Sequence, residues 1–243
     1  MTLLLSSVLS LLLLLWEAVK SWATKTSVYT ASSRSESTGN ISIINLQESK
    51  QNNASYPLKE IVVFLVIEGR IITLRTLRNS DAYSIYKNAK DREISKYTHL
   101  PYPYRLKHVH DFVRLCQEHY KKKTDYELGI ESKKTGEIIG MISLMHIDNR
   151  DRSAEVGYWL GNQYWRRGIT KEALTLILDF GFNNLELVRI YAKVPYPNLP
   201  SIRLLQSAGF RYEGRTRKSV FREGSWFDEL IFALVDEDFR ENC

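Results

Sequence analysis

The sequence has little cysteine, the residue that forms disulfides and many zinc sites. Its only two cysteines, Cys116 and Cys243, lie far apart, and neither stands in a Cys-x-x-Cys spacing or beside a histidine pair in zinc-binding order. This pattern indicates neither a disulfide framework nor a zinc site. The longest uncharged apolar run, residues 3–16, is also shorter than the ~20 residues that span a bilayer. We therefore expect no metal and no comfortable transmembrane helix.

The first quarter of the chain reads as an appendage. Residues 1–23 resemble a signal-peptide core with a possible cleavage site at Ser21-Trp22-Ala23, but they lack a positive n-region, so an over-long gene start is the alternative. Residues 24–60 are rich in Ser, Thr, Asn and Gln, which predicts a polar, disordered linker. We expect one folded domain over 61–240 and a cytoplasmic protein, with export or membrane association left open by the signal-like segment.

The chain is basic, with a formal charge of +6 and an isoelectric point near 9.2. Such a surplus suits an anionic partner, yet the sequence has no aromatic RNA-binding motif. A phosphate-bearing cofactor accounts for the charge as well as RNA does. We expect no nucleic-acid partner.

Hydrophobic patterning predicts an α+β domain with a mixed sheet. After a first strand at 70–78, helices are expected at 82–90 and 106–122, and three antiparallel strands at 125–131, 137–147 and 153–160. Apolar positions at helical spacing from Ala173 to Phe182 predict a long helix, followed by a β-branched strand at 188–194. This strand, helix, strand unit favours a parallel pair. A helix at 201–208 and strands at 210–217 and 226–235 complete the domain.

The stretch from Tyr164 to Ala173 joins a strand to the long helix. Free backbone N–H groups and the helix dipole converge at such a junction, which makes it an anion site. Gly168 would let the backbone approach a pyrophosphate closely, and Arg166 and Arg167 add positive charge. A solvated Arg-Arg turn at a helix start is the alternative interpretation of this stretch alone.

A longer resemblance includes this loop. Trp165-Arg166-Arg167-Gly168-Ile169-Thr170-Lys171-Glu172-Ala173 is similar to the pyrophosphate loop of the GNAT superfamily, and Asn198-Leu199-Pro200-Ser201 through Gly209-Phe210 resembles its Asn-x-x-Ser helix. From Glu155 to Phe239 these motifs follow in family order, closest to the RimJ/RimL-like branch that acetylates protein N-termini. Two positions depart from the pattern: Trp165 replaces an Arg or Gln, and Thr170 replaces a second small residue.

The resemblance implies a GNAT-like, mainly antiparallel sheet of about seven strands, flanked by helices, with a splayed central parallel pair. It implies that acetyl-CoA binds in that splay as co-substrate. The residues implied to hold it are Tyr158, Trp159 and Leu160 through their backbones, the loop residues Trp165, Arg166, Arg167, Gly168, Ile169 and Thr170, and Asn198.

The same resemblance implies direct transfer of acetyl to a primary amine. Glu155, on the strand leading into the splay, is the candidate base; an ordinary strand glutamate paired to an arginine is the alternative. The family's frequent acid, a tyrosine, is replaced by Leu205, so Ser201 is the candidate that protonates or steadies the sulfur. Its alternative is a simple first-turn helix residue.

Three questions stay open at this level. The acceptor could be a protein N-terminus, a polyamine or a small-molecule amine, and the protein could be a monomer or a homodimer. The runner-up function is a degenerate GNAT domain that holds acyl-CoA or a partner without transfer, which Leu205 and Thr170 would explain.

Overall fold

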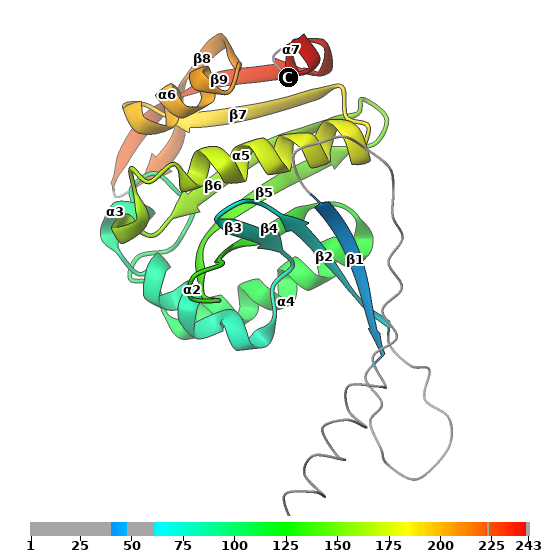
Figure 1. Ribbon diagram of the computed structural model, residues 1–243. Helices are drawn as coiled ribbons and strands as arrows, with labels where there is room; N and C mark the ends of the chain where they lie inside the picture. Colours follow the sequence, from blue (N-terminus) through cyan, green and yellow to red (C-terminus); the bar gives the residue numbers. More distant parts are fainter. Residues whose placement is uncertain (1–39, 48–60, 223, 242–243) are drawn as a thin grey trace, which may run out of the picture. The chain divides into compact units, whose positions relative to one another are not determined.

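The computed structural model describes residues 40–47, 61–222 and 224–241 (Figure 1). The described residues fall into two units, a smaller one with residues 42–47 and 61–65 and a larger one with residues 40–41, 66–222 and 224–241. The signal-like segment 1–23 and most of the predicted linker lie outside the described residues. Within that predicted linker, residues 40–47 are described as a strand. None of the helices in the described ranges is long and apolar enough to cross a membrane.

The described strands form one sheet in the order β1-β2-β3-β4-β5-β6-β7-β9-β8. Their bounds are β1 Asn40–Gln47, β2 Ile61–Glu68, β3 Ile72–Arg75, β4 Tyr126–Ser132, β5 Ile138–Asp148, β6 Ser153–Leu160, β7 Arg189–Pro195, β8 Arg211–Arg222 and β9 Ser225–Val235. The mixed, mainly antiparallel sheet is as predicted, with nine strands where about seven were expected. The two additional strands are β1 and β2. β1 lies within the predicted polar linker, and β2 was not predicted as a strand separate from the first expected strand at 70–78.

The predicted parallel pair is β6 and β7. Antiparallel pairing joins β3 through β6 on one side of it, and β7, β9 and β8 on the other. The crossover between β6 and β7 is the predicted long helix, so the connection has the length that a parallel pair requires.

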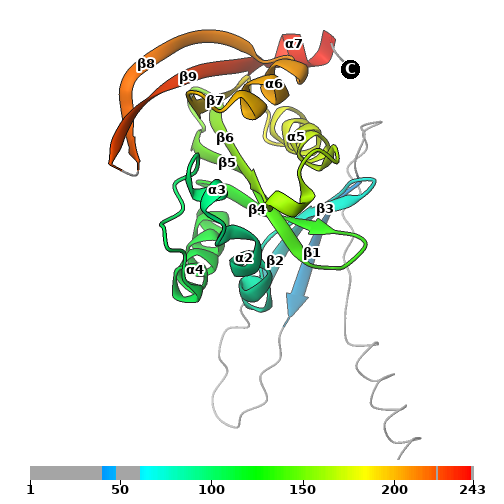
Figure 2. The ribbon, with the colours of Figure 1, turned by 90° about the vertical axis from the view of Figure 1, so that its left-hand side faces the viewer.

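Helices cover both faces of this sheet (Figure 2). Their bounds are α2 Ala82–Ala89, α3 Arg92–Ser95, α4 Leu106–Lys122, α5 Ile169–Asp179, α6 Leu199–Ser207 and α7 Asp236–Glu241. α2 and α4 lie on one face, and α5 and α6 on the other. A π-helical turn, Phe180–Asn184, continues α5, which explains why the apolar spacing predicts helix as far as Phe182. The C-cap residue of α4, Lys123, takes the left-handed conformation directly after the last helical residue, Lys122.

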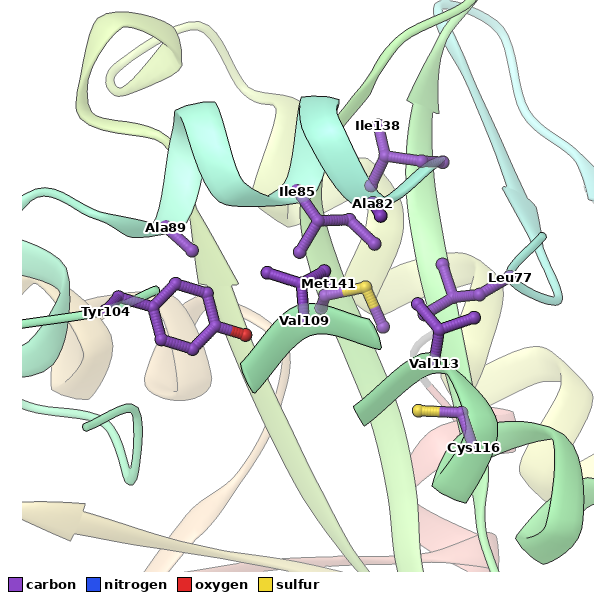
Figure 3. Packing of buried hydrophobic residues seen from close by; sticks show 10 residues of the cluster. All are labelled: Leu77, Ala82, Ile85, Ala89, Tyr104, Val109, Val113, Cys116, Ile138 and Met141. Atoms are coloured by element: carbon purple, nitrogen blue, oxygen red, sulfur yellow. The ribbon is translucent and has the colours of Figure 1, made fainter. Parts of the chain in front are cut away.

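An apolar cluster fixes α2 and α4 against β5 (Figure 3). Ile85 of α2 and Val109 and Val113 of α4 are completely buried, and they pack with Ile138 and Met141. Burial of this kind contributes roughly 25 cal/mol per Å² of apolar surface. Trp159 of the neighbouring strand β6 packs against the same residues, so the cluster also supports β6.

Candidate active site

The central feature of the site is a fork between β6 and β7. The parallel pairing of these strands ends at Glu155 and Tyr191, although both strands continue. Their outer edges stay paired, β6 with β5 as far as Leu160 and β7 with β9 as far as Pro195. The inner edges therefore diverge and present backbone N–H and C=O groups that no neighbouring strand takes up. Such groups must find another partner when water is excluded.

Alternation along β6 decides which backbone groups face the fork. Gly161 donates its N–H to Ile139 O of β5 at 2.9 Å, and because these groups alternate, Trp159 also directs its backbone at β5. Tyr158 and Leu160 direct theirs into the fork. Leu160 O already accepts from Trp165 Nε1 at 2.7 Å. Of the three residues predicted to bind through their backbones, Trp159 is turned away, and its side chain packs on the core instead.

The predicted anion loop caps helix α5. Gly168 is the N-cap residue, with φ of 75°, and a Cβ there would meet nothing within 4 Å, so glycine is favoured by backbone conformation rather than by space. Arg166 also takes a positive φ, 60°. Gly168 and Arg166 are exposed, and they directly precede the N-terminus of α5, a helix of 11 residues. Ile169, in contrast, is buried and anchors the first turn.

Two side chains near the loop leave the helix N-terminus open. Glu172, in the first turn of α5, accepts a hydrogen bond from Ile71 N at 2.8 Å and is thereby drawn toward the turn before β3. The Arg167 guanidinium lies 5.8 Å from the centre of the Tyr164 ring. The carboxylate that could compete with an anion at this helix N-terminus is thus engaged elsewhere.

Glu155 lies at the point where the fork opens. It is the last residue of β6 that pairs with β7, its side chain is only 15% exposed, and its Oε2 is 3.0 Å from Lys193 Nζ of β7. The ion pair that the alternative interpretation of Glu155 expected is present, with lysine in place of arginine. Hydrogen bonding to Glu155 raises the pKa of Lys193, so the ammonium form is the resting one.

More charged groups surround this pair. Glu229 of β9 and Arg222 of β8 act electrostatically on His99, which precedes α4 and also feels Glu155 and Lys193. Partial desolvation lowers the pKa of His99, and the Arg222 cation lowers it further. Arg222 also donates from Nη1 to Thr98 O. No sequence pattern predicts this charged group, because His99, Glu155 and Arg222 come from segments that only the fold brings together.

A pair of hydroxyl groups lies on the other face of β6. Tyr158 Oη and Ser201 Oγ are 2.8 Å apart, which joins β6 to α6. Burial raises the pKa of Tyr158 to about 12, so its phenol stays protonated at neutral pH. Tyr158 and Glu155 are three residues apart in a strand and therefore point to opposite faces. This side-chain contact of Tyr158 was not predicted from the sequence, which implied a role for its backbone only.

The remaining predicted residues of α6 have structural partners. Asn198 is the N-cap, and its Oδ1 accepts from Ser201 N at 3.4 Å, a contact that orients the first turn. Leu205 is completely buried and contributes packing only. No cluster of three or more metal-ligating side chains occurs among residues 64–222 and 224–241.

Comparison with known proteins gives consistent results. A family model described as an acetyltransferase (GNAT) domain matches residues 72–211. An uncharacterized N-acetyltransferase p20 of Bacillus licheniformis is 32% identical over 168 residues, which cover 69% of this chain and 94% of that protein. Spermidine N(1)-acetyltransferase of Vibrio cholerae is 26% identical over 157 residues, 65% of this chain and 88% of that protein.

Solved structures share the fold. Mycobacterium smegmatis RimJ, in complex with CoA-disulfide, is 27% identical with a TM-score of 0.62, over 69% of this chain and 83% of that chain.

Proposed function

The chain belongs to the GNAT family of acetyltransferases and is an acetyl-CoA-dependent N-acetyltransferase; from this premise we propose that it acetylates a primary amine by direct attack in a ternary complex. The observation that carries the proposal is the β6–β7 fork, which opens at Glu155 and lies next to the glycine-capped N-terminus of α5.

Acetyl-CoA is proposed to bind along the fork. The inward-facing backbone groups of Tyr158 and Leu160 would pair with the amides of the pantetheine arm, in place of a strand. Its pyrophosphate would lie on the N–H groups at Gly168, Ile169 and Thr170, with Arg166 and Arg167 nearby. Both binding features rest on backbone geometry, so the replacements at Trp165 and Thr170 do not remove them.

Glu155 is proposed as the general base. The acceptor approaches from the face of the sheet that carries α2 and α4, where Glu155 and its charged neighbours lie. The carboxylate takes a proton from the ammonium, directly or through a water, and the free amine attacks the thioester carbonyl carbon. A backbone N–H of the fork is suited to stabilise the oxyanion that forms.

The thiolate leaves toward the opposite face. There the Ser201 hydroxyl, hydrogen-bonded to the protonated phenol of Tyr158, is proposed to donate a proton to the sulfur. The amine nitrogen loses its second proton to solvent after the attack, and Ser201 regains a proton from solvent. The hydroxyl pair supplies the acid that Leu205 cannot supply. The observation weighs against the alternative of a domain that holds acyl-CoA without transfer.

We propose the class of acceptor from the charged side chains on the open side of the fork. A protein N-terminus and a polyamine both offer an ammonium to Glu155 and Glu229, and one relative is by its name a spermidine acetyltransferase. The proposal is tested by measuring the CoA thiol released from acetyl-CoA in the presence of a panel of amines. The panel contains short peptides with free N-termini, spermidine and small amines. We expect at least one amine to accelerate thiol release well above hydrolysis. If acetyl-CoA binds and no amine accelerates release, the domain is a binding module.

A further inference from the structure

Lys193 places an ammonium group beside the carboxylate proposed as the general base. Its Nζ is 3.0 Å from Oε2 of Glu155, the proposed base, and 5.6 Å from the centre of the Tyr191 ring. Glu155 and Tyr191 are register partners, and Lys193 is two residues further along β7 on the same face. The side chain is therefore held at the opening of the fork by two separate contacts.

The fork also determines what can reach this group. Beyond Tyr191 the inner edge of β7 has left β6, so Lys193 is the first residue on this face of β7 past the last paired position. In the proposed binding mode, the thioester of acetyl-CoA would lie in the fork beside this residue. Lys193 keeps 42% of its side chain exposed, which leaves it room to move, whereas Glu155 is 15% exposed.

We infer that Lys193 is a site of self-acetylation, in which the chain's own ε-amine takes the acetyl group from bound acetyl-CoA. Lys193 Nζ gives a proton to Glu155 and attacks the thioester carbonyl carbon. An N–C bond forms, the C–S bond breaks, and CoA leaves as thiolate that is protonated to the thiol. The products are acetyl-lysine, CoA and the one proton that Glu155 then releases to solvent. The inference rests on the proposed function, because it uses the same base and the same substrate.

Self-acetylation changes the site. The amide that forms carries no charge, so the ion pair to Glu155 is lost and the carboxylate faces the fork without its cation. Because the resting lysine is protonated, the reaction requires proton transfer first, and its rate should rise with pH. It also proceeds within one chain, so the first-order rate should not depend on protein concentration.

The test is peptide mass spectrometry of the full chain incubated with acetyl-CoA and no added amine. The exposed Lys218 of β8 serves as an internal reference for non-enzymatic acetylation. We expect Lys193 to be acetylated at least ~10-fold faster than Lys218, because the effective concentration of a held amine is high. In Gly168→Asp, which should not bind acetyl-CoA, the two lysines should react equally slowly. Lys193→Arg should abolish the modified peptide, and Lys218→Arg should leave Lys193 acetylation unchanged.

Equal rates at Lys193 and Lys218 in the unaltered chain would overturn the inference. Thiol release with the amine panel, measured on the same sample, separates the two proposals. If an added amine turns over while Lys193 stays unmodified, only self-acetylation is wrong. If neither reaction occurs, the proposed function is wrong as well.

Discussion

Two neighbouring regions of the sheet differ in burial and in strand pairing: the core under α2 and α4, and the β6–β7 fork. In the core, side chains such as Ile85 and Val113 are completely buried, and antiparallel ladders join β3 to β4, β4 to β5 and β5 to β6. At the fork, pairing stops at Glu155, and charged groups are only partly covered. The core contributes stability, and the fork gives up strand pairing to gain a place for a substrate. Mutations in the core should therefore mainly lower stability, and mutations at the fork should mainly lower activity.

The largest effect is expected at the helix cap beside the fork. Gly168→Asp puts a carboxylate where the pyrophosphate should lie, so acetyl-CoA affinity should fall by at least ~100-fold. Gly136→Asp is a matched control, because Gly136 also has a positive φ, 69°, and open space for a Cβ, but belongs to the β4–β5 turn. Calorimetric titration of both folded variants measures the difference. Equal affinity in the two would remove the loop from the binding site.

The second prediction tests the core. Ile85→Ala leaves a cavity between α2 and α4, so the free energy of unfolding should fall by about 2–5 kcal/mol. Leu115→Ala, on the exposed side of α4, should change it by less than ~0.5 kcal/mol. Denaturant unfolding measures both. Turnover of the folded Ile85→Ala protein should stay within about twofold, and a large loss of turnover would show that the core also shapes the chemistry.

The smallest effect concerns the hydroxyl pair. Tyr158→Phe and Ser201→Ala should each lower turnover by about tenfold, and the double variant by little more, because the two groups act as one unit. Tyr83→Phe, an exposed tyrosine of α2, is the control and should be silent. Steady-state kinetics decides the matter. Strictly multiplicative losses would mean that the two hydroxyls act independently.

Much of the fold could be predicted from local patterns. α4 occupies the predicted residues 106–122, β6 the predicted 153–160, and the parallel pair follows from one long amphipathic helix between two strands. These features depend on periodicity and capping within short windows. The strand β1 was missed because its residues lie in a polar stretch, where composition outweighed the short apolar alternation.

The arrangement of the site was harder to predict from the sequence than the fold. Glu155 and Ser201 were candidates through family motifs, but their partners, Lys193 and Tyr158, lie 38 and 43 residues away in the chain. Register decides which residues of β6 face the fork, and a sequence pattern does not give register between distant strands. Asn198 shows the converse: its motif was recognised, and the structure gives it a capping bond that the motif alone leaves unspecified.

The most direct test of the account is the pH dependence of Glu155→Gln. The amide keeps the shape of the side chain but cannot accept a proton, so turnover at neutral pH should fall by ~100-fold or more while acetyl-CoA affinity changes little. The loss should shrink as pH rises, because more of the acceptor amine is then already neutral. Turnover at the parental rate at neutral pH would contradict the account, and would mean that solvent deprotonates the amine before it binds.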